Sequence, residues 1–113
     1  MNLPATPFAI VSASLLALAA SPALAVLDNA SAQALMKKDN CAACHMIDKK
    51  LLGPAYQDVA AKYAGDKAAV EKLTKKVKEG GSGVWGSIPM PPNSSTPDAD
   101  IKELVTWILT LKK

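Results

Sequence analysis

The feature that most constrains the fold of this chain is the pentapeptide Cys41-Ala42-Ala43-Cys44-His45. It matches C-x-x-C-H, the attachment motif for a c-type haem. Two thiols three positions apart can reach the two vinyl groups on one edge of a porphyrin, and the imidazole of the next residue then lies under the ring and can bind the iron. His45 is the only histidine of the chain. The motif therefore predicts one covalently bound haem c with His45 as an axial ligand.

Other interpretations of the two cysteines fit the sequence less well. A thioredoxin-like redox pair is expected beside a βαβ pattern, and no period-two strand pattern appears. A zinc site needs about four ligands, and Cys and His side chains here total three. A disulfide between Cys41 and Cys44 would close a loop of only a few residues and constrain little of the unfolded chain. A haem-free thiol–disulfide protein stays open as an alternative.

An apolar run over residues 8–20 precedes the motif and is followed by Pro22 and by Ala23, Leu24 and Ala25. An apolar stretch closed by small residues in an A-x-A arrangement predicts a secretory signal peptide, here residues 1–25 with cleavage after Ala25. A membrane anchor or a buried helix is the alternative, but the run is short of the ~20 residues that a spanning helix needs. We therefore expect export through the Sec pathway to the periplasm, with no membrane insertion after cleavage.

The predicted mature domain, residues 26–113, carries scattered lysines and no basic block. The chain has 13 Lys and Arg against 10 Asp and Glu, a net charge of +3. This pattern argues against a nucleic-acid surface and favours docking to acidic redox protein partners. We expect a monomer. So short a domain buries a modest core, and an attached cofactor would supply the rest.

The residues after position 27 predict an all-α domain, with helices separated by loops rich in Gly and Pro. Asp28, Asn29 and Ser31 are N-cap candidates for a first helix that ends near residues 39–40, with Ala30, Ala34 and Leu35 on one side.

Three more helices are predicted further along the chain. One covers residues 56–63 and ends at Gly65, and the next covers residues 67–79, capped by Asp66. The apolar stripe of this third helix is Val70, Leu73 and Val77. The last helix begins at residues 96–98, with a capping hydroxyl from Thr96, and is expected to run to the C-terminus. Residues 84–95, rich in Pro and Gly, should form no regular element.

The second axial position of the iron separates electron carriers from gas binders and catalysts. Three of the four methionines are badly placed, in the signal peptide or beside the motif: Met1, Met36 and Met46. Met90 lies in a stiff loop between Pro89, Pro91 and Pro92, with enough chain after His45 to pass round the haem edge. By elimination we predict that Met90 is the second ligand, with plain packing as the alternative. With Met90 as packing, the chain would be a five-coordinate gas-binding or peroxidatic haem protein.

Four segments, CAACH, LLGPAYQDVAAKYAG, SGVWGSIPMPPN and DADIKELVTWILTLK, together resemble the small bacterial class I cytochromes c of the cytochrome c-551/c-552 type. The resemblance covers residues 28–113. It implies a cytochrome c fold of four to five helices wrapped around one covalently bound haem, and it supports Met90 as the sixth ligand.

The same resemblance implies further roles in the haem pocket. The Pro54 carbonyl would accept the imidazole N–H of His45, Trp85 would donate its indole N–H to a haem propionate, and Asn93 would hydrogen-bond near the Met90 sulfur. Core packing for Trp85 and an ordinary turn for Asn93 are the alternatives. Such proteins are electron carriers, not enzymes; they accept electrons from the cytochrome bc1 complex and deliver them to a periplasmic nitrite reductase or a terminal oxidase.

Overall fold

A computed structural model describes residues 1–5, 7, 9–17 and 26–113 of the chain. The predicted cleavage site of the signal peptide, after Ala25, lies outside the described residues. Those described before position 18 form no helix or strand. No helix in the described ranges is long and apolar enough to cross a membrane.

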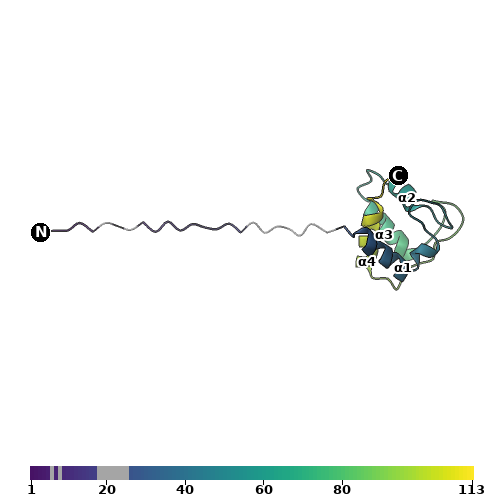
Figure 1. Cartoon of the computed structure of the whole chain (residues 1–113), viewed down its shortest axis with the longest axis horizontal. Helices are drawn as coiled ribbons and strands as arrows, with labels where there is room; N and C mark the ends of the chain where they lie inside the picture. The colour runs from purple at the N-terminus through teal and green to yellow at the C-terminus, as the bar shows by residue number, and fades with distance from the viewer. Residues whose placement is uncertain (6, 8, 18–25) are drawn as a thin grey trace.

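From residue 26 onward, the described chain contains four α-helices and one short 3-10 helix (Figure 1). In chain order they are α1 (Asn29–Lys38), η1 (Cys41–Ala43), α2 (Tyr56–Lys62), α3 (Ala69–Glu79) and α4 (Asp98–Ile108). The β-structure of these residues is one isolated antiparallel bridge between Gly81 and Met90. The predicted all-α class is confirmed.

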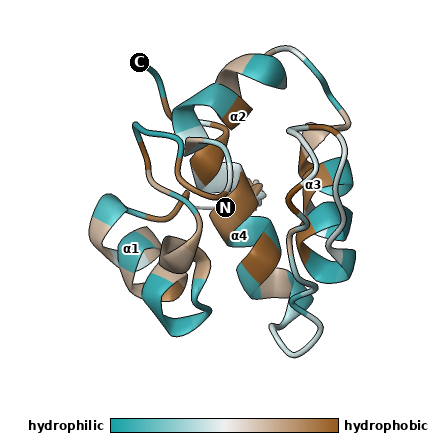
Figure 2. Cartoon of the chain, turned by 90° about the vertical axis from the view of Figure 1, so that its right-hand side faces the viewer, coloured by the Kyte–Doolittle hydropathy of each residue, from teal (hydrophilic) through white to brown (hydrophobic). Residues whose placement is uncertain are grey.

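Helix α4 forms the centre of the molecule, because its apolar side chains recur every three or four residues. Figure 2 shows its hydrophobic surface between α1 and α3, with α2 beyond one end. Five of its side chains are buried: Ile101, Leu104, Val105, Trp107 and Ile108. Three of them, Leu104, Trp107 and Ile108, form one core cluster with Ala32 and Met36 of α1 and with Tyr56 and Val59 of α2. Full burial of one such large apolar side chain stabilises the fold by about 1.5–3 kcal/mol.

Helix α1 begins where the sequence predicts but buries a different face. Asp28 is the N-cap, since its Oδ1 accepts a hydrogen bond of 2.7 Å from the backbone N–H of Ser31. The buried residues are Ala32 and Met36, and Leu35 packs partly buried against the same core as predicted, whereas Ala30 and Ala34 are exposed, so the buried face is shifted from the predicted one. This side of α1 faces inward because α1 packs on α4. The indole N–H of Trp107 in α4 donates a hydrogen bond to Asn29 Oδ1 at 3.0 Å.

Helix α3 starts two residues later than predicted. Asp66 Oδ1 accepts from the backbone N–H of Ala68 at 2.9 Å and holds residues 66–68 in a turn, so the helix begins at Ala69. The predicted stripe of Val70, Leu73 and Val77 is only half-buried.

Helix α4 begins at Asp98, within the predicted start, but its cap and its C-terminal end differ from the prediction. Pro97 is its N-cap residue and no side chain caps it; Thr96 is buried, and its carbonyl accepts from Lys78 Nζ at 2.8 Å. At the other end, Thr110 donates both its N–H and its hydroxyl to the Trp107 carbonyl, at 3.0 and 2.6 Å. This tight turn ends the helix at Ile108, short of the C-terminus.

Candidate haem site

The C-x-x-C-H motif is presented by one tight turn after α1. Asn40 has a left-handed φ of 57° and turns the chain out of the helix. The backbone N–H groups of Cys44 and His45 then both donate to the Cys41 carbonyl, at 3.1 and 3.0 Å. Both cysteines are half-buried, and no disulfide joins them. The turn therefore places two thiols and one imidazole on a single short segment.

The ring of His45 is oriented by the backbone of the following loop. Its Nδ1 lies 2.8 Å from the carbonyl oxygen of Pro54, the contact that the family resemblance implied. Because a carbonyl oxygen can only accept, Nδ1 carries the proton and donates it. The lone pair of Nε2 is then the one available for a metal ion, the usual arrangement of a histidine ligand with a backbone partner.

Gly53 allows the backbone to lie directly against this imidazole. A Cβ at this position would stand 2.5–2.9 Å from three atoms of the His45 ring. The Gly53 N–H also donates to the Cys44 carbonyl at 2.8 Å, which folds the loop back over the motif. A glycine is therefore required here by close approach to the ring. This cradle fits an axial ligand whose ring must keep one orientation.

Tyr56 is a site residue that the sequence analysis missed. Its ring stacks on His45, with centroids 5.0 Å apart and an angle of 16° between the planes. Its other neighbour is Trp107, which meets it edge-on at 6.4 Å and 84°. Burial, and then the neighbouring Cys41, raise the pKa of the Tyr56 phenol far above its ordinary value, so the hydroxyl stays neutral. The available signal was its place in the sequence, an aromatic residue two positions after Pro54.

The electrostatics of Cys41 do not resemble those of a redox-active thiol. Burial raises the pKa of this thiol above its ordinary value, and the nearby carboxylate of Asp39 raises it further. Reactive cysteines of thiol–disulfide proteins have a lowered thiol pKa instead. In the part of the chain that the structure describes, no cluster of three or more His, Cys, Asp or Glu side chains could hold a metal ion. The two thiols and one imidazole of Cys41, Cys44 and His45 are the set that covalent attachment and axial ligation of a haem need.

Met90 lies half-buried in the loop that joins α3 to α4. Its N–H donates to the Gly81 carbonyl at 2.8 Å, and the Gly81 N–H donates back to the Met90 carbonyl at 3.0 Å. Gly80, with a φ of 70°, ends α3 so closely against Met90 that a Cβ would collide with the Met90 carbonyl. The backbone of Met90 is thus fixed against the end of α3. Met36 is buried in the core and Met46 is exposed.

Trp85 and Asn93 occupy different surroundings in the same loop. Trp85 is 39% exposed, and Lys62 Nζ of α2 lies 5.4 Å from the centroid of its ring. Asn93 donates its side-chain N–H to the Val77 carbonyl at 3.2 Å and lines a small cavity together with Cys41. The structure therefore brings Asn93 near Cys41 and His45 near Pro54. A propionate contact for Trp85 and a contact of Asn93 with the Met90 sulfur stay predictions.

The loops that carry His45 and Met90 also present large apolar side chains. Six of them are between 39% and 59% exposed: Met46, Leu51, Leu52, Val84, Trp85 and Ile88. Large apolar side chains left exposed on both of these loops are what a chain that covers an apolar group would carry. Together with the cradle around His45, they fit a flat apolar group such as a porphyrin.

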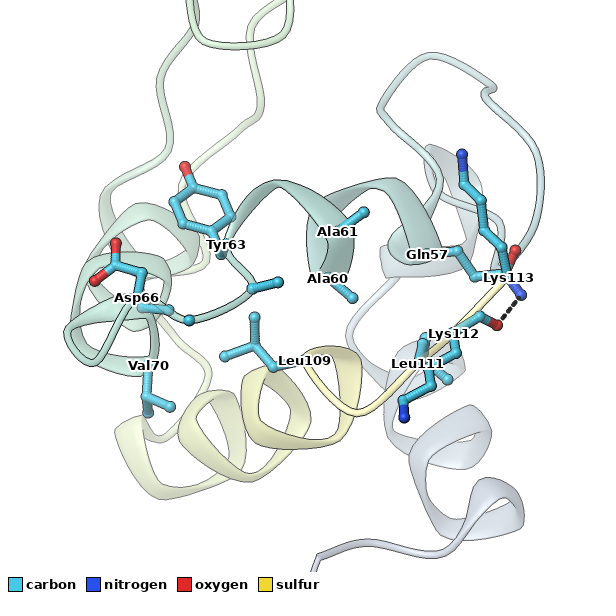
Figure 3. A pocket seen from close by; sticks show the side chains of 13 residues that line it. Gln57, Ala60, Ala61, Tyr63, Asp66, Val70, Leu109, Leu111, Lys112 and Lys113 are labelled. Carbon is cyan, nitrogen blue, oxygen red and sulfur yellow. Dashed lines mark hydrogen bonds between the residues drawn. The ribbon is translucent and has the colours of Figure 1, made fainter.

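A second concavity lies between α2, the first turn of α3 and the C-terminal residues (Figure 3). Its volume is about 500 Å³, and Figure 3 shows Leu109 between the helices that border it. Across one end, Gln57 donates to the Lys112 carbonyl at 3.0 Å. None of the predicted haem residues lines this groove, and it holds no histidine, cysteine or methionine. It is therefore separate from the candidate site.

Sequence and structure comparisons match the chain to known proteins of one family. Residues 30–112 match the family model of cytochrome c. The chain is 55% identical over 94 residues to cytochrome c-552 of Nitrosomonas europaea, covering 82% of this chain and 91% of that protein. It is 57% identical over 77 residues to cytochrome c-551 of Allochromatium vinosum, covering 68% and 82%. The crystal structure of wild-type Nitrosomonas europaea cytochrome c552 matches with a TM-score of 0.68 and 56% identity, over 71% of this chain and 99% of that chain.

Proposed function

The chain belongs to the cytochrome c family, and we propose that His45 and Met90 are the two axial ligands of its haem iron. As a family member it is a monohaem electron carrier and not an enzyme, with one covalently bound haem c for which Cys41 and Cys44 fit the attachment motif. Haem with His and Met ligands has a raised reduction potential and no open coordination site, so the iron can change its charge without changing its ligands.

The observation that carries the proposal is the way the chain holds these two residues. The hydrogen bond from His45 Nδ1 to the Pro54 carbonyl keeps the proton on Nδ1 and leaves Nε2 for the iron. The Met90 backbone is fixed by its paired hydrogen bonds with Gly81. A thioether is a weak neutral donor, so it benefits from a backbone that is already held in place.

Replacement of Met90 by Ala tests the ligation. Haem should stay attached through Cys41 and Cys44, but the absorption band that arises from sulfur bound to ferric iron should disappear. The reduction potential should fall, and cyanide should bind the opened iron readily. Spectra and potentiometric titration of the purified holoprotein measure these changes.

Met46→Ala is the matched control, because Met46 adjoins His45 but is exposed. This variant should keep the sulfur-to-iron band, and its reduction potential should shift far less than that of Met90→Ala. An unchanged potential in Met90→Ala would rule out ligation by Met90. A high-spin wild-type ferric spectrum that azide alters freely at neutral pH would favour the five-coordinate gas-binding or peroxidatic alternative.

We further propose that the protein works in the periplasm, after removal of residues 1–25, as a monomer. Its electron donor would be a quinol-oxidising complex, cytochrome bc1, and its acceptor a terminal reductase or oxidase such as nitrite reductase. The signal-peptide pattern before Val26 supports export. The net charge of +3 supports docking to acidic protein partners.

A further inference from the structure

Tyr56 is the buried side chain of the haem site that neither the attachment motif nor the proposed axial ligation uses. It is the first residue of α2, and 5% of it is exposed. Its backbone N–H donates to the Met46 carbonyl at 3.0 Å, which ties the start of α2 to the residue after His45. The backbone of Tyr56 is therefore held by a hydrogen bond, and its ring is buried.

The ring of Tyr56 is confined on two sides. Against His45 it is nearly parallel, at 16° and 5.0 Å between centroids, so the imidazole cannot rotate far without meeting it. Against Trp107 it is nearly perpendicular, at 84° and 6.4 Å. Trp107 is itself held, since it is only 2% exposed and its indole N–H donates to Asn29 Oδ1 at 3.0 Å. A chain of contacts thus runs from α1 through α4 to the face of the imidazole.

The hydrogen bond to Pro54 alone does not fix the plane of the His45 ring. A single N–H···O contact fixes the direction of one ring atom, and the ring can still turn about the line from Nδ1 to the carbonyl oxygen. A flat neighbour parallel to the imidazole limits this remaining rotation.

We propose that Tyr56 is a positioning residue that sets the plane of the His45 imidazole through ring stacking. The inference rests on the proposed role of His45 as an iron ligand. Tyr56 acts on the iron only through His45, while Pro54 keeps the proton on Nδ1. The hydroxyl of Tyr56 plays no part in this role.

Replacement of Tyr56 by Leu in the haem-loaded protein tests the proposal. Exchange of the His45 Nδ1 proton with deuterium, followed by proton NMR in the reduced state, should become roughly two- to tenfold faster, as expected from loss of one aromatic pair. In the ferric state, the pattern of paramagnetically shifted haem methyl resonances should change, because it depends on the direction of the imidazole plane. Tyr56→Met, which also lacks a flat ring, serves if the Leu variant loses its haem.

Two controls separate positioning from plain packing. Tyr56→Phe keeps the ring and should retain the wild-type exchange rate and resonance pattern. Ile108→Ala removes a side chain of the same core cluster on α4, and should lower stability without moving either readout. The proposal is overturned if Tyr56→Leu leaves both readouts unchanged, or if Tyr56→Phe or Ile108→Ala changes them equally. If Met90 is not a ligand, the wild-type protein will lack the absorption band of sulfur bound to ferric iron. This result is distinct from the outcomes of the Tyr56 variants.

Discussion

At position 53 the imidazole of His45 occupies the space that a side chain would fill. The three nearest atoms to a Cβ there all belong to the His45 ring, and that ring is held by Pro54 and covered by Tyr56. The ring therefore has little freedom to give way. The absence of a side chain at Gly53 is as much a part of the site as the histidine itself.

We expect Gly53→Ala to destabilise the holoprotein by about 1–3 kcal/mol, the usual cost of overpacking. The added methyl group should also push His45 away from Pro54, so the Nδ1 proton should exchange faster. Denaturant unfolding and proton NMR measure the two effects. Gly65→Ala is the control, because that glycine has a φ of 78° and open space around it. Gly65→Ala should strain the backbone and leave the exchange rate of the His45 Nδ1 proton unchanged. An equal exchange rate in Gly53→Ala and Gly65→Ala would contradict the steric explanation.

At the residue scale, the sequence was most informative where local spacing determines the chemistry. Cys41, Cys44 and His45 are adjacent along the chain, so their shared turn could be predicted from the motif alone. The partner of His45 at Pro54 followed from the family resemblance. The stacking of Tyr56 could not be predicted, because it depends on how α2 returns over the motif and on Trp107, which lies 51 positions later in the sequence.

At the scale of the helix, α3 depends on one carboxylate at its start. Asp66 accepts from the Ala68 N–H with one oxygen and from Lys72 Nζ with the other, at 2.9 and 2.8 Å. The hydrogen bond from Lys72, and then that from Ala68, lower the pKa of the Asp66 carboxyl below its ordinary value of 3.8. The charged Asp66 carboxylate therefore stabilises the folded protein fully at pH values above 3.8, and this stabilisation is lost as the pH falls through the lowered pKa.

We therefore expect Asp66→Asn to melt at a lower temperature than the wild type at neutral pH. The difference should shrink as the pH falls below 3.8, since the wild-type carboxylate is then protonated as well. Thermal denaturation over a series of pH values measures it. Glu71→Gln, an exposed acid of the same helix, is the control and should show a smaller effect. A melting difference that stays constant with pH would contradict the role of the Asp66 charge.

The helices were predictable from apolar spacing and capping, and so were the starts of α1 and α2 and the end of α3, but the start of α3 and the end of α4 were not. The end of α4 was missed because Thr110 donates twice to the Trp107 carbonyl, a local competition that hydrophobic spacing does not reveal. The buried face of α1 was missed because it is chosen by contact with α4. In both cases a tertiary or side-chain contact, rather than helix propensity, decides the outcome.

At the scale of the whole molecule, the chain carries a net charge of +3. If the protein docks to an acidic redox complex, the rate of its reduction by cytochrome bc1 should fall several-fold as salt rises from about 0.01 M to about 0.15 M. Screening shortens the reach of the charges from about 30 Å to about 8 Å over this range. Stopped-flow absorption of the haem measures the rate. Reduction by uncharged hydroquinone is the control and should not depend on salt; a salt-independent rate with the complex would contradict charge steering.

The hydrogen bond between Asn29 and Trp107 joins residues 78 positions apart and has a consequence for the order of events during synthesis. A ribosome makes α1 first and α4 last, at about 5–20 residues per second. The core side of α1, Ala32 and Met36, packs in a cluster with Leu104, Trp107 and Ile108, so it has no place to be buried until α4 has emerged. Until then we expect the segment with Cys41 and Cys44 to stay accessible for haem attachment, and a chain exported through the Sec pathway, as proposed, would cross the membrane in the same order, α1 before α4.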